Sequence, residues 1–141
     1  MANIDFPDST LYIQSAHMAL MLSHVIKEAP LEACGLVAGL NNSSLGVFPI
    51  TNVLKSIHRY RMDPQEQINT LIHIEQNKMD LIAIYHSHPK GPKIPSVTDL
   101  KETNYPEIPH LIFSGIKNKW ECHAYKLRGF EYQEVKIMNP K

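Results

Sequence analysis

The sequence has few cysteines and no disulfide pattern. Cys34 and Cys122 are the only two in 141 residues, and they form no CxxC pair. This argues against both a disulfide framework and a structural zinc site built from thiolates. We interpret each cysteine as a small, buried apolar residue.

The sequence also lacks an excess of one charge and any long hydrophobic run. Lys and Arg residues number 14, as do Asp and Glu residues, and the cations are scattered along the chain. The field that would attract nucleic acid or an anionic membrane is therefore missing. No segment approaches the ~18 apolar residues of a membrane span, and the N-terminal MANIDFPDST lacks a basic region followed by an apolar stretch. We expect no nucleic-acid partner, no membrane partner and a cytoplasmic location.

The composition that is present is typical of a globular protein. Apolar residues make up 43% of the chain and charged residues 20%, both ordinary values. A chain of this length has the common size of one domain. We therefore predict a single domain over residues 1–141 with one hydrophobic core.

Hydrophobic spacing predicts two long helices and a hairpin in the first half of the chain. The first helix, residues 14–28, places its apolar side chains on one face. Short apolar runs on either side of residues 41–44 predict two strands joined by a surface turn. Asp63 as N-cap and Pro64 as first helical residue begin a second helix, which continues to about Met79.

The segment DLIAIYHSH, residues 80–88, predicts a central strand. Apolar side chains point to both of its faces, so other elements must cover both faces. One face carries Leu81, Ala83 and Tyr85, and the other carries Ile82, Ile84, His86 and His88.

The rest of the chain predicts a loop, a short helix and three strands. Three prolines in PKGPKIP stiffen the loop and exclude a regular ladder. A short helix follows in SVTDLKETN, with Ser96 as its N-cap. The strands are HLIFSGI, KWECHAYKL and FEYQEVKI, with breaks at residues 117–118 and 128–129. The predicted fold class is α/β or α+β, with one mixed sheet, two long helices and one short helix.

Two histidines and an aspartate have the spacing of a metal site. His86 and His88 are two residues apart on a strand, so their imidazoles leave the same face a few ångströms from each other. Asp99 lies in the first turn of the short helix, and the preceding loop is long enough to fold it back over the histidines. Two imidazole nitrogens and one carboxylate oxygen form the three-ligand shell of a catalytic zinc, with the fourth position left for water. The spacing thus predicts one catalytic Zn²⁺.

Glu32 is the candidate for the carboxylate that transfers protons. Zinc lowers the pKa of bound water from roughly 16 to about 7, yet another group must take the proton and hand it to the leaving amine. Glu32 precedes a run of small and apolar residues, which is an unusual place for a carboxylate in a strand that reads as buried. The sequence alone does not place it beside the metal.

Each of these residues also has a simpler structural interpretation. A histidine is most often structural or solvated, and the HSH pattern alone supports ligation and a structural role about equally. Ser96 and Asp99 have the spacing of a capping box with Asp in place of Glu, which needs no metal. The other histidines are isolated or too far apart to share an ion, and we interpret them as structural or surface residues: His17, His24, His58, His73, His110 and His123.

The run HSHPKGPKIPSVTD, from His86 to Asp99, resembles the JAMM signature of the MPN-plus metalloproteases. That signature is His-x-His-Pro-x(6)-Ser-x(2)-Asp with a distant Glu before it, and every element is present. The segments EACGLVAG, YRMDPQEQ and IYHSHP extend the resemblance over most of the chain, to the small prokaryotic members of the family.

The resemblance implies a fold and a set of roles. The fold is a curved mixed sheet flanked by helices, similar in general arrangement to cytidine deaminase. His86, His88 and Asp99 are implied to bind zinc. Glu32 is implied to act as general acid and base, and Ser96 to stabilise the oxyanion of the tetrahedral intermediate.

The resemblance also implies a substrate class. Family members hydrolyse a peptide or isopeptide bond after the C-terminal Gly-Gly of a ubiquitin-like or sulfur-carrier protein, for example to release cysteine from the carrier. The chain has little room for the insertions with which larger eukaryotic members hold ubiquitin, so we expect weak or absent activity on ubiquitin chains. Two other functions stay open: a non-catalytic MPN scaffold that binds partners, and a zinc amidohydrolase of a small molecule. The oligomeric state is open too, with a homodimer as one alternative.

Overall fold

The computed structural model describes residues 10–103 and 105–140. Its strands are β1 Thr10–Tyr12, β2 Cys34–Leu40, β3 Ser43–Ile50, β4 Asp80–His88, β5 His110–Ile116, β6 Lys119–Arg128 and β7 Glu131–Met138. Its helices are α1 Ser15–Glu28, α2 Pro64–Gln76 and α3 Val97–Glu102. None of the helices in this described part of the chain is long and apolar enough to cross a membrane.

The strands form one mixed, strongly curved sheet that closes into a barrel in the order β1-β3-β2-β4-β5-β6-β7. β4 pairs in parallel with β5. On either side of this pair, β2 is antiparallel to β4 and β6 is antiparallel to β5. Closure depends on β1, which pairs in parallel with β7 and with β3. The predicted mixed sheet with flanking helices is confirmed. β1 was not predicted, because three residues are too few for a periodic pattern.

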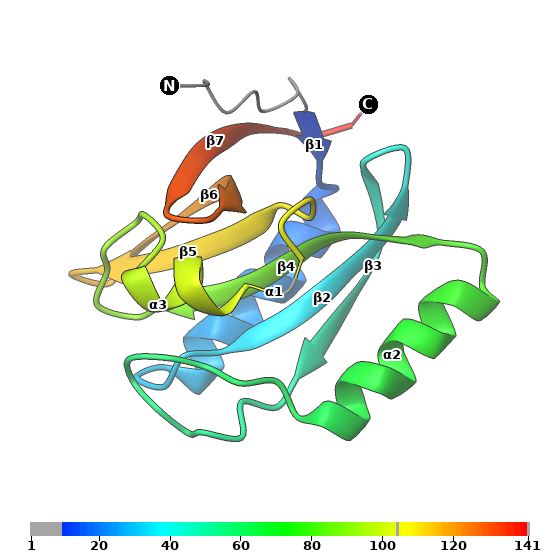
Figure 1. Ribbon diagram of the computed structural model, residues 1–141. Coiled ribbons are helices and arrows are strands. Elements are labelled where there is room, and N and C mark those ends of the chain that lie inside the picture. The colour runs from blue at the N-terminus through cyan, green and yellow to red at the C-terminus, as the bar shows by residue number, and fades with distance from the viewer. Residues whose placement is uncertain (1–9, 104, 141) are drawn as a thin grey trace.

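Helices cover the two faces of the central strands (Figure 1). On one face, Met21 and Val25 of α1 pack in a core with Tyr85 and Phe113. On the other face, beneath α2, a second core includes Leu36, Ile50, Met62 and Ile84, with Leu71 packed against it. The prediction of a central strand covered on both sides is therefore confirmed, although the apolar interior is divided into separate clusters.

A bulge changes which side chains of β4 face each core. Ala83 and Tyr85 lie in the first core and Ile84 in the second, as predicted. Ile82, however, lies in the first core and Leu81 packs against the second, the reverse of the prediction. The register between β2 and β4 shifts at this point, and an inserted residue reverses the alternation of all side chains on one side of it.

The hairpin turn is tighter than the sequence predicted. Asn41 and Asn42 alone form it, with φ angles of 52° and 62°, the left-handed values of a two-residue hairpin that asparagine tolerates well. Ser43 and Ser44 begin β3 instead of extending the turn. Ser44 is buried because its hydroxyl oxygen accepts a hydrogen bond from the Gln14 backbone N–H at the start of α1.

α2 begins as predicted and ends earlier than predicted. The Asp63 side chain accepts hydrogen bonds from the backbone N–H groups of Gln65 and Glu66, and Pro64 occupies the first turn. The helix ends at Gln76 instead of near Met79, because Lys78 adopts a left-handed φ of 58° and the Met79 N–H turns back to the Ile74 carbonyl oxygen. The predicted end of the short helix at Asn104 lies outside the described residues.

Candidate metal centre and its cleft

His86 and His88 lie at the carboxyl end of β4. This strand is buried between β2 and β5, and both imidazoles are almost fully shielded from solvent. Their Nε2 atoms are 3.2 Å apart. The sequence prediction that both rings leave one face of the strand is confirmed.

The loop after β4 orients His88. The His88 Nδ1 atom donates to the carbonyl oxygen of Pro92 at 2.7 Å, which orients the ring so that Nε2 is the atom directed at His86 and Asp99. Gly91 makes this return possible, since its φ of 74° is a left-handed value that glycine adopts without strain. The proline-containing loop is thus a rigid support for one imidazole.

Asp99 completes a compact group of donor atoms. Its Oδ2 atom lies 3.1 Å from Nε2 of His86 and 3.1 Å from Nε2 of His88. The carboxylate is 6% exposed. It is held there by the capping box of α3, because Oδ2 also accepts from the Ser96 backbone N–H at 2.8 Å.

This triangle of two nitrogens and one oxygen fits a zinc ion. Ligand bonds of about 2.0–2.1 Å around a tetrahedral zinc put neighbouring donor atoms ~3.3 Å apart. The observed separations of 3.1, 3.1 and 3.2 Å agree with that spacing. Three protein donors would leave one tetrahedral position of the metal for water or substrate, which is the arrangement of a catalytic centre.

Charge and hydrogen bonding act strongly on two of these groups. Burial alone would raise the pKa of the Asp99 carboxyl, but positive charge on His86 and hydrogen bonds from both imidazoles hold that pKa well below its usual range. Burial alone would lower the pKa of His88, but its hydrogen bond with Asp99 and the Asp99 charge raise it overall. The site therefore favours a negative carboxylate against positive charge, as a cation-binding site requires.

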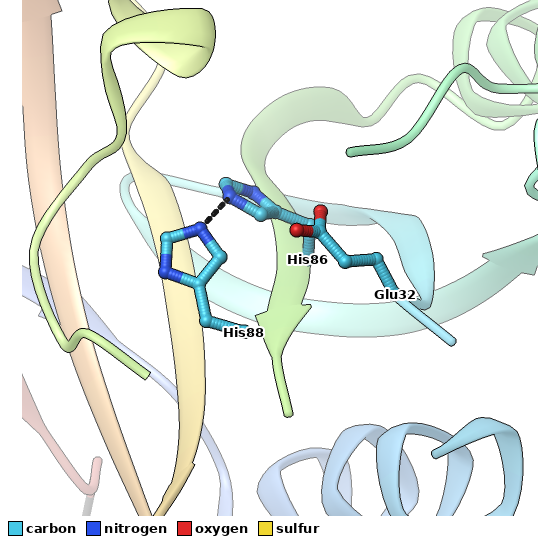
Figure 2. Close-up of side chains that lie close together, drawn as sticks. All are labelled: Glu32, His86 and His88. Atoms are coloured by element: carbon cyan, nitrogen blue, oxygen red, sulfur yellow. Dashed lines mark hydrogen bonds between the residues drawn. The ribbon is translucent and has the colours of Figure 1, made fainter. Parts of the chain in front are cut away.

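Glu32 lies in the segment just before β2. It is not part of that strand, which begins two residues later at Cys34. Glu32 is 4% exposed, and its carboxylate points toward the imidazoles (Figure 2). One of its oxygens lies within 4.8 Å of a ring nitrogen of both His86 and His88, close enough for the three residues to hold a metal ion together. The Glu32 Oε1 atom has no hydrogen-bond partner among the residues that the structure describes. Burial raises the pKa of Glu32 to about 8.

Hydrogen bonds fix the backbone on both sides of Glu32. The Ala33 N–H donates to Ser87 Oγ at 2.8 Å, and the Ser87 N–H donates to the Ala33 carbonyl oxygen at 3.0 Å. The Asn52 side chain donates to the Glu32 carbonyl oxygen, and the Glu32 N–H donates to Ser56. Because Ser87 lies between the two histidines, the same strand positions both imidazoles and the carboxylate.

Ser96 acts as the N-cap of α3 and faces the same cleft. Its Oγ accepts from the Asp99 backbone N–H at 3.0 Å, so the predicted capping box is present. The hydroxyl hydrogen is not used by that bond. A cleft of about 240 Å³ brings Ser96 together with Glu32 and His88.

Sequence reasoning missed three side chains around this centre. Tyr60 stacks on His86, with ring centroids 4.7 Å apart. His110, predicted to be isolated, is buried with its ring centroid 6.3 Å from His86, and His58 lines the cleft. No local pattern could have found them, because His58 and Tyr60 come from the loop before α2 and His110 comes from the start of β5. Cys34 is buried as predicted, and burial raises the pKa of its thiol to about 12.

Comparisons with known sequences agree with this geometry. Residues 14–128 match the family of prokaryotic homologs of the JAB domain. A probable TtuB-protein conjugate cleaving protease from Thermus thermophilus is 38% identical over 73% of this chain and 69% of its own length. A desampylase from Pyrococcus furiosus is 37% identical over 95% of this chain and 94% of its own. A CysO-cysteine peptidase from Mycobacterium tuberculosis is 30% identical over 85% and 81%.

Solved structures show the same fold. A protein from Desulfitobacterium hafniense superposes with a TM-score of 0.82 at 27% identity, over 93% of each chain. A JAB1/MPN domain protein from Archaeoglobus fulgidus superposes with a TM-score of 0.57 at 19% identity, over 92% of this chain and all of the other, which supports the fold alone. The chain therefore belongs to the family of prokaryotic homologs of the JAB domain.

Proposed function

We propose that this protein is a zinc-dependent peptidase that cleaves the bond following the C-terminal Gly-Gly of a ubiquitin-like or sulfur-carrier protein. The observation that carries the proposal is the triangle of His86, His88 and Asp99 donor atoms with an unpartnered, buried Glu32 carboxylate beside it. Zinc held by that triangle would polarise the scissile carbonyl and acidify water.

The two carboxylates have different environments, which supports different roles. Asp99 Oδ2 contacts both imidazole nitrogens, as a ligand would. Glu32 keeps an oxygen free of hydrogen bonds and is the base: it takes a proton from the attacking water as the water oxygen bonds to the carbonyl carbon. When the carbon–nitrogen bond breaks, Glu32 returns that proton to the leaving amine nitrogen.

Ser96 is the donor to the developing oxyanion in this proposal. Its hydroxyl hydrogen is not used by the capping bond, in which Oγ only accepts. A donor aimed at the position where negative charge develops stabilises the transition state more than the ground state. The capping box orients Ser96 before substrate arrives.

The substrate class rests on the relatives. The three named above act on TtuB-protein conjugates, on sampylated proteins as the name desampylase states, and on a CysO-cysteine adduct. We propose the same kind of acyl side here, a carrier tail ending in Gly-Gly, with residues 1–141 forming one catalytic domain. The cytoplasmic location and the homodimer alternative stay predictions of the sequence.

The decisive experiment separates metal binding from proton transfer. Glu32→Gln should retain one zinc per chain in metal analysis and lose hydrolysis of a β-grasp carrier Gly-Gly–cysteine adduct by ~10²–10⁴-fold, followed by intact mass. His88→Gln should lose both zinc and hydrolysis. Glu28→Gln is the matched control, because Glu28 lines a neighbouring cavity with Glu32 but lies outside the donor triangle.

Three results would contradict the proposal. Unchanged turnover of Glu32→Gln would remove Glu32 from the proton-transfer role. Purified protein without zinc, and unable to take it up, would favour the non-catalytic scaffold. Efficient hydrolysis of small amides with no carrier cleavage would favour the small-molecule amidohydrolase instead.

A further inference from the structure

Two segments near the site carry charges of one sign only. Residues 51–62 and 86–98 contain five Lys and Arg residues and no Asp or Glu, although the whole chain has zero net charge. All 14 acidic residues and the other nine Lys and Arg residues lie elsewhere. We call the five cations of these two segments the basic rim: Lys55, Arg59, Arg61, Lys90 and Lys93.

Four members of the basic rim line cavities that border the candidate metal centre. Lys90 lines the cleft that contains Glu32, His88 and Ser96. A small cavity beside Asp99 is lined by Arg59. A cavity of about 440 Å³ is lined by Arg61 and His110. Another, of about 400 Å³, is lined by Lys55 and Glu32. Carboxylates line the same cavities, namely Glu28, Glu32, Glu66, Asp99 and Glu102. The basic rim therefore supplies the positive charge of a mixed surface beside the site.

The charges of the basic rim are available to a partner. All five side chains are exposed, and among the described residues no carboxylate lies within ion-pair distance of any of them. Arg128 provides a contrast, since it pairs with Glu107 at 2.8 Å. Exposed cations without an ion-pair partner can attract an acidic group of another molecule.

Hydrogen bonds hold the backbone that carries the rim. The Asn52 side chain donates to the Arg59 carbonyl oxygen and accepts from the Arg61 N–H, and it also donates to the Glu32 carbonyl oxygen. In the second segment, the Tyr125 hydroxyl donates to the Lys93 carbonyl oxygen at 2.7 Å. The rim backbone is thus tied to the catalytic segment and needs little ordering when a partner binds.

Exposed aliphatic side chains lie beside the basic rim, and the aromatic ring of its first segment is already engaged. Ile57, which lines the cleft, is 44% exposed, and Ile94 is 41% exposed. Tyr60, the aromatic ring of the first segment, is engaged by His86 at 4.7 Å. Single-stranded nucleic acid binds mainly by stacking bases on free aromatic rings. The combination of cations and exposed aliphatic side chains instead suits a protein surface.

We propose that the basic rim docks an acidic protein segment, namely the Asp- and Glu-rich surface from which the substrate's C-terminal Gly-Gly tail emerges. This inference rests on the proposed function and adds a partner chemistry to it. The rim attracts the acidic face, and the tail then enters the cleft beside Glu32. Attraction between exposed charges of this kind raises the association rate and weakens at high salt.

The test uses three fluorescein-labelled peptides of about ten residues that end in Gly-Gly with a free carboxylate. Their upstream residues alternate serine with glutamate, glutamine or lysine. They contain no scissile bond after Gly-Gly, so fluorescence anisotropy reports binding whether or not the protein hydrolyses anything. We expect the glutamate peptide to bind about tenfold more tightly than the glutamine peptide at low salt, and the preference to shrink in about 0.5 M NaCl.

Charge reversal locates the effect. Arg59→Glu combined with Lys90→Glu should abolish the preference for the glutamate peptide. The matched control is Lys78→Glu combined with Lys136→Glu, two exposed lysines outside the rim, of which Lys78 precedes the opposite end of β4. This control makes the same change in net charge and should keep the preference. Thermal unfolding by circular dichroism shows that each variant is folded.

Three outcomes overturn the inference. One is equal binding of the three peptides, and another is loss of the preference in the control pair. The third is tighter rim-dependent binding of a labelled single-stranded RNA than of the glutamate peptide. A glutamate preference without hydrolysis of any carrier conjugate would count against the proposed peptidase activity but would support the acidic partner.

Discussion

The side chains of Ser96 and Asp99 each accept a hydrogen bond from the backbone N–H of the other residue. The Asp99 N–H donates to Ser96 Oγ at 3.0 Å, and the Ser96 N–H donates to Asp99 Oδ2 at 2.8 Å. The same Oδ2 lies 3.1 Å from both imidazole nitrogens. The motif that begins α3 therefore also fixes one corner of the candidate metal site, so the capping and ligand interpretations of these residues are compatible.

Replacing Ser96 tests its two roles separately. Ser96→Ala removes a helix cap and should lower the free energy of unfolding by about 1 kcal/mol. It also removes the proposed oxyanion donor and should lower kcat by roughly 10²–10³-fold. Ser96→Thr keeps a hydroxyl for both roles and should restore most of both. Urea unfolding and carrier cleavage are measured on the same preparations, and a kcat unchanged in Ser96→Ala would leave only the capping role.

Ser87 should position Glu32 through Ala33. Ser87→Ala leaves the buried Ala33 N–H without its hydrogen-bond acceptor, which should cost about 1–3 kcal/mol of stability. Because the freed segment carries Glu32, kcat should fall while zinc content stays at that of the unmodified protein. Ser114→Ala on β5 is the matched control, since the buried Ser114 hydroxyl has no partner to lose. Equal effects of the two substitutions on kcat would show that Ser87 has no specific positioning role.

His110 should make the folded protein sensitive to acid. Burial and the neighbouring His86 charge lower its pKa to about 3, whereas an unfolded histidine has a pKa of about 6.5. Between about pH 6.5 and pH 3, His110 is protonated in the unfolded state but not in the folded state. The contribution of neutral His110 to stability is therefore fully present above about pH 6.5 and is lost as the pH falls toward 3. The loss contributed by His110 between pH 8 and pH 5 should be about 2 kcal/mol.

The measurement compares urea unfolding at pH 8 and pH 5 in the presence of a chelator, so that metal release contributes equally. His110→Gln should reduce the difference in stability between the two pH values. Thr103→Val removes the hydroxyl that contacts His110 Nε2 at 3.2 Å and keeps the imidazole, so it should shift stability similarly at both. An undiminished pH difference in His110→Gln would exclude His110 as its source.

Ubiquitin dimers should be poor substrates. The β2–β3 turn consists of Asn41 and Asn42, and the turns at 117–118 and 129–130 are equally short, so none of them carries an inserted subdomain that could hold ubiquitin. Lost remote contacts lower kcat as well as affinity. We expect dimer cleavage roughly 100-fold or more slower than cleavage of a carrier conjugate, measured at the same low enzyme concentration. Comparable rates would contradict this prediction.

Much of the fold was predictable because its signals are local. The spacing of apolar residues predicted α1 and the strand pairs, and Asp63 with Pro64 predicted the start of α2. The His86 and His88 spacing predicted that both rings face one side, since alternate residues of a strand share a face. The exact ends of the strands were not predictable in this way. The sequence pattern could not decide that Asn41 and Asn42 form the turn while Ser43 and Ser44 belong to the following strand.

Other features depended on contacts between distant segments. The reversal of Leu81 and Ile82 required the bulge against β2, and barrel closure required β1 to meet β7. Neither leaves a mark in the local sequence, because pairing partners far apart in the chain determine them.

The amino-acid sequence by itself determined the donor types, their spacing and the helix cap that carries Asp99, since these are set by side-chain chemistry and by strand and helix periodicity. Only the tertiary structure placed Glu32 beside the histidines and brought cations of two loops to cavities beside the site. Residues 32 and 86 are brought together by the pairing of β2 with β4. The basic rim follows from the same packing, because charges that are distant in the chain act together only where the fold brings their loops near one another.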